Sequence, residues 1–122
     1  MIKTIFYKIY FKIKDLVYLL KCTPYRVKYG FWPHELWSLD WTIAKFILPR
    51  LIQFKKTYAG FPAGMTSKEW NNILRNMISS FHYTSKQFDS ESLKSPEALQ
   101  EEYKLYQQGL YNFAKYFGAL WT

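Results

Sequence analysis

The sequence predicts an all-α protein, a compact single-domain bundle of four to five helices that spans residues 1–122. Apolar residues recur at steps of three and four in four separate stretches, which is the period of an amphipathic helix. Two of these stretches open with residues that typically cap helices. In addition, a chain of 122 residues that is 49% hydrophobic and 21% aromatic can bury a substantial core in one domain.

The first predicted helix covers residues 2–21. Its apolar stripe consists of Ile2, Ile5, Phe6, Ile9, Ile13, Leu16, Val17 and Leu20. Alternating apolar residues over 5–13 also fit a strand, but the stripe continues to Leu20 at helical spacing, which favours the helix. Because proline cannot donate a backbone hydrogen bond, we expect Pro24 to close this helix and residues 22–32 to form an irregular connection.

A second helix is expected to begin near Pro33, since proline is favoured in a first turn, and to run to about Lys56. Pro49 lies inside it and lacks the N–H that a regular helix needs. We therefore expect either a kink or a division into two helices at Pro49. The Gly and Pro content of residues 57–65 predicts a loop.

A capping box marks the start of the third helix. The Thr66 hydroxyl can accept from the Glu69 amide, while the Glu69 carboxylate accepts from the Thr66 amide. An apolar face follows at helical spacing, and the helix is expected to end near Tyr83. Residues 84–95 are rich in Ser, Lys, Gln and Asp and predict a polar connection.

The fourth predicted helix covers residues 97–120 and is opened by Ser95, Pro96 and Glu97 in the order cap, first turn, acid. Its apolar residues recur at alternating steps of four and three: Leu99, Tyr103, Tyr106, Leu110, Phe113, Phe117 and Leu120. This heptad spacing predicts a seam for another helix, which belongs either to this chain or to a second copy.

Positive charge is concentrated near the amino end. Residues 1–30 contain seven Lys or Arg residues and one acid, Asp15, so they contribute +6 to the net charge of +8. Aromatic residues are interleaved with these cations. Three interpretations are open: a solvated lysine face over an aromatic core, a contact with nucleic acid or a nucleotide, or a helix on a membrane surface. Residues 1–20 contain too many charged side chains for a membrane-spanning helix, so we expect no membrane span there.

The sequence contains little that points to catalysis. His34 and His82 have no carboxylate or second histidine at metal-ligand spacing, and the five glycines are too scattered to form a phosphate loop. The single cysteine, Cys22, excludes an internal disulfide and is interpreted as a small buried or half-buried hydrophobic residue. We therefore expect neither an enzyme nor a metal or cofactor. The cysteine content and the lack of a signal-peptide pattern predict a cytoplasmic location.

Two further features of the second helix point to function. Asp40 lies on the predicted inner stripe, where an unpaired carboxylate is costly, so it should pair with a cation or else face a ligand. A second possible anion site follows Pro49; its residues are Arg50, Lys55, Lys56 and Tyr58. These residues could bind an anion together with the amides of the following loop, or they could form an ordinary solvated helix terminus.

Several segments between residues 29 and 81 occur, in order, in a known group of proteins. They are Tyr29-Gly30-Phe31, Glu35-Leu36-Trp37-Ser38-Leu39-Asp40, Ala44-Lys45-Phe46-Ile47-Leu48-Pro49-Arg50-Leu51, Gly60-Phe61-Pro62 and Thr66-x-x-Glu69-Trp70-x-x-Ile73-Leu74-x-x-Met77-Ile78-x-x-Phe81. This stretch resembles small, mostly uncharacterised proteins of tailed bacteriophages, which usually carry an acid in place of Lys68 and often Ser or Thr in place of Trp32. The resemblance implies a phage origin and a helical fold, but it implies no activity.

Together these observations predict a non-enzymatic binding protein for an anionic ligand, with a nucleotide or nucleic acid as the first choice. The expected contact residues are Arg26, Lys28, Tyr29, Arg50, Lys55 and Tyr58. Small phage proteins without catalytic residues commonly act by binding, for example by blocking a host defence enzyme or sequestering a signalling nucleotide, so we expect a binding role of this kind in the host cytoplasm. The alternative is an assembly module, either a homo-oligomer or a binder of a host protein, that uses the heptad seam.

Overall fold

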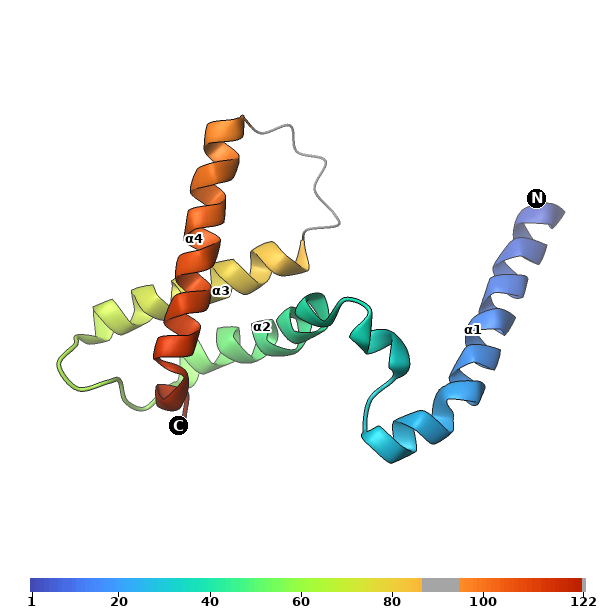
Figure 1. Ribbon diagram of the computed structural model, residues 1–122, viewed down its shortest axis with the longest axis horizontal. Helices are drawn as coiled ribbons and strands as arrows, with labels where there is room; N and C mark the ends of the chain where they lie inside the picture. The colour runs from blue at the N-terminus through green and yellow to red at the C-terminus, as the bar shows by residue number, and fades with distance from the viewer. Residues whose placement is uncertain (87–94, 122) are drawn as a thin grey trace. The chain divides into compact units, whose positions relative to one another are not determined.

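The computed structural model describes residues 1–86 and 95–121, and these residues form four α-helices and two short 3-10 helices (Figure 1). The predicted all-α class is confirmed. The elements in chain order are α1 (Ile2–Tyr29), η1 (Pro33–Leu36), α2 (Leu39–Thr57), α3 (Ser67–Ser85), α4 (Pro96–Lys115) and η2 (Phe117–Ala119). The predicted polar connection over 84–95 lies mostly outside the described residues, but its first two residues, Thr84 and Ser85, belong to α3.

The chain divides into two compact units, Met1–Leu39 and Asp40–Thr122. Unit 1 is built around one long helix, α1, and the segment that contains η1. Unit 2 contains α3, α4, η2 and nearly all of α2, and it holds the hydrophobic core.

Helix α1 is longer than the sequence predicts. It continues through Pro24 and ends at Gly30, so the predicted irregular connection over 22–32 is mostly helix. Proline at position 24 removes the hydrogen bond to the Leu20 carbonyl, but Leu20 is exposed and water can bond to that carbonyl instead. The left-handed backbone of Gly30, with φ at 85°, allows its N–H to donate to the Arg26 carbonyl at 2.7 Å.

The second predicted helix is divided, but not at Pro49. Its first turn, residues 33–36, is the separate 3-10 helix η1, and α2 begins only at Leu39. Pro49 lies inside an uninterrupted α2. Both Pro49 and Lys45, whose carbonyl loses its backbone partner, are exposed, so that solvent can replace the missing hydrogen bond.

Both predicted capping signals are confirmed. The Thr66 hydroxyl accepts from the Glu69 amide at 3.2 Å, and the Thr66 amide donates to the Glu69 carboxylate at 2.7 Å, which opens α3. At the start of α4, the Ser95 hydroxyl accepts from a first-turn amide at 3.2 Å. Helix α4 ends at Lys115 rather than at residue 120, and η2 follows it.

The core of unit 2 forms where α2, α3 and α4 meet. Its buried apolar residues come from α2 and α3: Ala44, Leu51, Trp70, Leu74, Met77 and Phe81. The indole of Trp41 donates to the Ser85 carbonyl at 3.3 Å, and the hydroxyls of Tyr58 and Ser67 lie 3.0 Å apart. Because these contacts join opposite ends of the two helices, α2 runs antiparallel to α3. Figure 1 shows α4 crossing α3.

The heptad seam of α4 finds its partner within the chain along its C-terminal half. Leu110 and Phe113 pack against the core, and the Phe113 ring meets Phe81 edge-on with the centroids 5.0 Å apart. The seam prediction is wrong for Phe117, which is exposed. The α-helix ends before this residue, and the tighter 3-10 turn that follows no longer keeps the heptad register, so Tyr116 packs against the core instead.

Gly109 allows the backbone of α4 to approach α3 closely. A Cβ at this position would overlap the Ser80 hydroxyl and would lie 2.6 Å from the Asn76 carbonyl oxygen. Two hydrogen bonds depend on this approach. The Ser80 hydroxyl donates to the Tyr106 carbonyl at 2.8 Å, and the side-chain Nδ2 of Asn112 donates to Asn76 Oδ1 at 2.8 Å. Ser80 is only 1% exposed, so its hydroxyl requires a partner inside the protein.

We expect the substitution Gly109→Ala to destabilise unit 2, although alanine forms helices better than glycine by about 1 kcal/mol. The added methyl group has to push α3 and α4 apart, and overpacking of this kind costs about 1–3 kcal/mol. Urea unfolding followed by circular dichroism measures the change. Gly118→Ala is the matched control, because a Cβ there meets no described atom within 4 Å. Equal stability of the two variants would contradict the close packing.

Candidate functional site

The residues of α1 sort onto opposite faces of the helix. Each residue advances about 100° around the axis, which places the aliphatic residues on one side and most of the aromatic residues on the other. The aromatic face consists of Tyr7, Phe11, Tyr18, Tyr25 and Tyr29. Basic residues occupy the two strips between these faces, with Lys3, Lys14, Lys21 and Lys28 in one strip and Lys8, Lys12 and Arg26 in the other.

The rest of unit 1 packs on the aromatic face. After the turn at Gly30, residues 31–37 return alongside α1, so that the Tyr18 ring lies 5.8 Å from His34 and 6.4 Å from Trp37 between centroids. At the start of η1, the Glu35 carboxylate accepts from the backbone amide of Trp32. This segment therefore covers the C-terminal half of the aromatic face.

A basic–aromatic cluster forms where α1 ends and the chain turns back. It consists of Tyr25, Arg26, Lys28, Tyr29, Phe31 and Trp32. The ring centroids of Tyr25 and Tyr29 are 4.5 Å apart, and the Phe31 ring meets Tyr25 edge-on with the centroids 5.7 Å apart. The Arg26 guanidinium lies 5.3 Å from the Trp32 ring centroid, and the Lys28 ammonium lies 5.0 Å from that of Tyr29. Three of the predicted contact residues, Arg26, Lys28 and Tyr29, lie in this segment, but Arg26 and Lys28 flank the aromatic face from opposite sides, about 160° apart around the helix.

The other three predicted contact residues lie on α2 and have different surroundings. The Arg50 guanidinium donates to the Phe46 carbonyl at 2.6 Å and lies 3.7 Å from the Phe46 ring centroid, so it is held against its own helix. The Tyr58 ring packs against the core, and its hydroxyl pairs with Ser67. Lys55 is half-buried and lies about 140° around the helix from Arg50. These three residues do not share one face.

Asp40 does not occupy the position that the sequence predicts. The carboxylate is exposed in the first turn of α2, so its placement on the inner stripe is wrong. Because α2 begins only at Leu39, Asp40 lies beside backbone N–H groups that have no partner within the helix. A negative charge at this end of a helix is favourable, and this interaction accounts for Asp40 without a buried cation or a ligand.

The side chains that could act in catalysis have ordinary surroundings. The His34 ring lies beside Tyr18 at a tilt of 50°, and His82 is exposed in the last turn of α3. Cys22 is half-buried beside Tyr18. Burial of the Tyr18 hydroxyl is the main cause that raises the pKa of this phenol above its ordinary value, and the interaction with the Cys22 thiol raises the pKa further. Tyr18 therefore stays protonated near neutral pH. The described residues contain no group of His, Cys, Asp or Glu side chains that could hold a metal ion.

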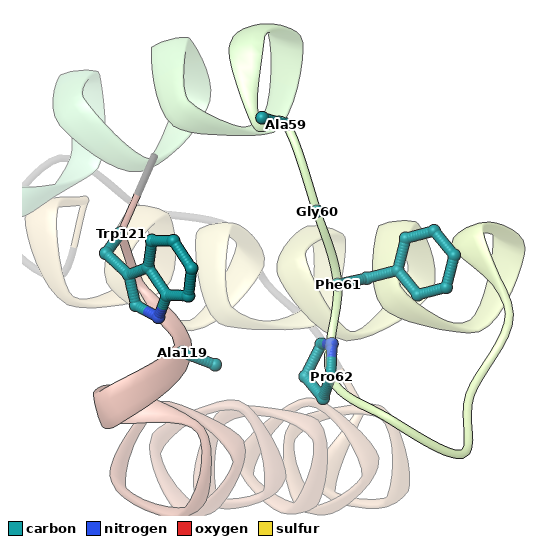
Figure 2. Close-up of a pocket in the computed structure, with 6 residues that line it drawn as sticks. All are labelled: Ala59, Gly60, Phe61, Pro62, Ala119 and Trp121. Atoms are coloured by element: carbon teal, nitrogen blue, oxygen red, sulfur yellow. The ribbon is translucent and has the colours of Figure 1, made fainter.

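A shallow hollow lies in unit 2 between the α2–α3 loop and the C-terminal segment (Figure 2). Its lining residues are Ala59, Gly60, Phe61, Pro62, Ala119 and Trp121. In Figure 2 the Phe61 ring points away from Trp121. Because the lining side chains are apolar except for the Trp121 indole N–H, this hollow offers neither charge nor a nucleophile.

Comparisons with known proteins yield no assignment for the chain. No protein-family model matches it, and no curated protein or solved structure shows significant similarity to it. The properties of the chain's own residues therefore carry the functional argument.

The predicted contact residues did not include three aromatic members of the cluster, Tyr25, Phe31 and Trp32, although Tyr25 is one of the aromatic residues interleaved with the cations in the sequence. A signal for the first was present, since Tyr18, Tyr25 and Tyr29 recur at steps of seven and four, opposite the aliphatic stripe. Phe31 and Trp32 join them only because the chain reverses at Gly30, a turn that the sequence placed within an irregular connection.

The turn at Gly30 should be sensitive to any side chain. We expect Gly30→Ala to cost about 1–2 kcal/mol locally, because its left-handed φ of 85° is unfavourable for residues with a Cβ. Amide hydrogen exchange in residues 31–37 should become roughly tenfold faster. The control is Gly60→Ala. The φ of Gly60 is not left-handed, and a Cβ at this position would have open space around it. Unchanged exchange in the Gly30 variant would show that the turn does not hold the segment.

Proposed function

We propose that this protein is a non-enzymatic binder of an anionic ligand, a nucleotide or nucleic acid, and that the basic–aromatic cluster makes the contact. One observation carries the proposal: two cations lie against aromatic rings at the end of α1, Arg26 against Trp32 and Lys28 against Tyr29. Tyr29 keeps half of its surface exposed, so part of its ring is available to a ligand.

The chemistry of the cluster suits a ligand that carries both phosphates and bases. Guanidinium and ammonium groups neutralise phosphate charge, and a flat ring provides a stacking surface for any base. The net charge of +6 over residues 1–30 would strengthen the attraction and speed association at low ionic strength. Sequence-tolerant binding follows from this combination, since neither stacking nor phosphate contact reads the edges of bases.

The biological setting of this proposal rests on the resemblance over residues 29–81. A phage-encoded binder of this kind would act in the host cytoplasm, where sequestering a nucleotide signal or coating nucleic acid would counter a host defence. The cluster lies within residues 25–32 and shares only Tyr29 and Phe31 with the resembling segments. Binding and phage origin are therefore separate parts of the proposal.

We expect a fluorescently labelled single-stranded oligonucleotide to bind the protein with an affinity that falls steeply as salt is raised. The double substitution Arg26→Ala and Lys28→Ala should weaken binding and reduce the slope of log affinity against log salt by about two, or roughly one for each lost phosphate contact. Fluorescence anisotropy at several salt concentrations gives both quantities. A labelled nucleotide, measured in the same way, separates the two ligand classes.

The control for this measurement removes the same amount of charge from unit 2, outside the cluster. Lys68→Ala and Lys104→Ala together change exposed lysines at the start of α3 and on α4, where Lys104 pairs with Glu101. This variant should keep most of the affinity. The proposal fails if the two double variants lose affinity equally, or if binding of every tested ligand is absent or independent of salt.

A second candidate function, assembly through α4, is favoured by the uncovered part of the heptad seam. Whereas Leu110 and Phe113 pack against the core, Leu99 and Tyr103 at the other end of α4 are 49% and 50% exposed. This part of the seam would remain available to α4 of a second copy. Helices that meet at heptad positions can pair in this way even when half of the seam is used internally.

If α4 mediates assembly, Leu99→Lys combined with Tyr103→Lys should convert an oligomer into a monomer, because two charges would be buried at the contact. Light scattering coupled to size-exclusion chromatography measures the mass. Leu105→Lys is the control, since Leu105 is also exposed but lies off the seam. A monomeric unmodified protein at high concentration would exclude this second candidate.

A further inference from the structure

The aliphatic face of α1 is a continuous apolar surface that remains exposed. Its eight residues, the aliphatic stripe, are 43–71% exposed: Ile2, Ile5, Phe6, Ile9, Ile13, Leu16, Val17 and Leu20. Exposed apolar residues are common one at a time, but a stripe of this length along one helix indicates a surface that binds something.

The way in which unit 1 folds makes this stripe distinct from the cluster described above. Within Met1–Leu39, which is described throughout, residues 31–37 pack on the aromatic face of α1. The aliphatic stripe lies on the opposite side of the helix. A partner could therefore cover the stripe without displacing any contact that holds unit 1 together.

The charges beside the stripe indicate the chemistry of that partner. Basic residues follow both edges: Lys3, Lys14 and Lys21 on one side, and Lys8 and Lys12 on the other. The one acidic residue of the helix, Asp15, lies beside Lys8 on the second edge. A long lysine side chain can lay its methylene groups along the stripe and direct its ammonium outward, so the partner should present an apolar interior with anionic groups around it.

An anionic lipid surface has this combination, and other occupants fit less well. Two copies of α1 packed stripe to stripe would bring their lysine edges together, which like-charge repulsion disfavours. Nucleic acid would satisfy the lysines, but Phe6 is the one ring in the stripe, and the seven aliphatic side chains offer bases no stacking surface. A bilayer that contains acidic headgroups satisfies both the charges and the apolar side chains.

The helix would lie along such a surface rather than cross it. Among the described residues, no helix combines the length and the apolar character that a transmembrane segment requires. Helix α1 alternates apolar and charged residues around its circumference, as helices in the headgroup region do. In that orientation the aromatic face and residues 31–37 would point toward water.

We infer that α1 binds anionic membrane surfaces by lying in the interface with its aliphatic stripe inserted between the lipids. The anionic headgroups contact Lys3, Lys8, Lys12, Lys14 and Lys21. This inference goes beyond the proposed function, because the stripe and the basic–aromatic cluster occupy different surfaces of unit 1. A substitution can therefore abolish membrane binding by the stripe without abolishing ligand binding by the cluster, and the reverse.

Co-sedimentation of the full chain with lipid vesicles tests this inference. We expect strong binding to phosphatidylcholine vesicles that contain roughly a third phosphatidylserine, weak binding to pure phosphatidylcholine, and a decrease as salt is raised. Ile9→Gln combined with Ile13→Gln should lower the partition coefficient about tenfold or more, because two side chains at the centre of the stripe no longer insert. Tyr7→Gln combined with Phe11→Gln is the matched control, since these exposed residues lie on the opposite face.

A second measurement shows which face enters the lipid and does not depend on the folding of those variants. In a Cys22→Ser background, an environment-sensitive dye is attached to Ile13→Cys or to Phe11→Cys. On anionic vesicles the dye at position 13 should shift to the blue as it leaves water, whereas the dye at position 11 should change little.

Three results would overturn the inference. Equal loss of vesicle binding in the two glutamine variants would show that the stripe has no special role. A fall in melting temperature confined to the Ile9 and Ile13 variant would show that the stripe packs against the protein itself. Equal dye shifts at positions 11 and 13 would exclude the proposed orientation. Arg26→Ala combined with Lys28→Ala should keep more vesicle binding than oligonucleotide binding, because the lysine edges of the stripe remain.

Discussion

Unit 2 depends on the close approach of α4 to α3 at Gly109. With no side chain at this position, the α4 backbone comes near enough to accept a hydrogen bond from the buried hydroxyl of Ser80, and Asn112 reaches Asn76. These polar contacts fix how far α4 can slide along α3, since a shift would leave a buried hydroxyl without a partner. The aromatic packing of Phe113 on Phe81 follows from that register.

Unit 1 follows a different principle, because it has one long helix and no comparable core. Its order comes from ring contacts between the aromatic face of α1 and residues 31–37, made possible by the reversal at Gly30. Rings pack well in a small interface because each covers a large area with few rotatable bonds. The aliphatic residues of α1, which would ordinarily build a core, remain exposed instead.

This division of α1 would allow one basic helix to serve both of the partners proposed above. Positive charge acts over several ångströms and attracts phosphates and anionic headgroups alike, so charge alone does not distinguish them. The apolar groups beside the charges make the distinction. Partly exposed rings at the C-terminal end suit bases, whereas the aliphatic side chains along the opposite face suit lipid chains.

Local patterns in the sequence determined the helical class, the caps at Thr66 and Ser95, and the concentration of charge in α1. These features depend on residues within about one helical turn or on simple composition, so they can be inferred without a fold. Arg26, Lys28 and Tyr29 were predicted for the same reason, as neighbouring residues of a single helix end.

Only the tertiary structure decided the features that depend on solvent access or on distant segments. Helix α1 continues through Pro24, and α2 through Pro49, because exposed carbonyls can bond to water, which a sequence pattern does not reveal. Asp40 is exposed because α2 begins later than its apolar period indicates. Phe31 and Trp32 reach the rings of α1, and Gly109 reaches Ser80, only through folding of the chain, since residues far apart in sequence or across a turn meet at a distance that local spacing does not determine.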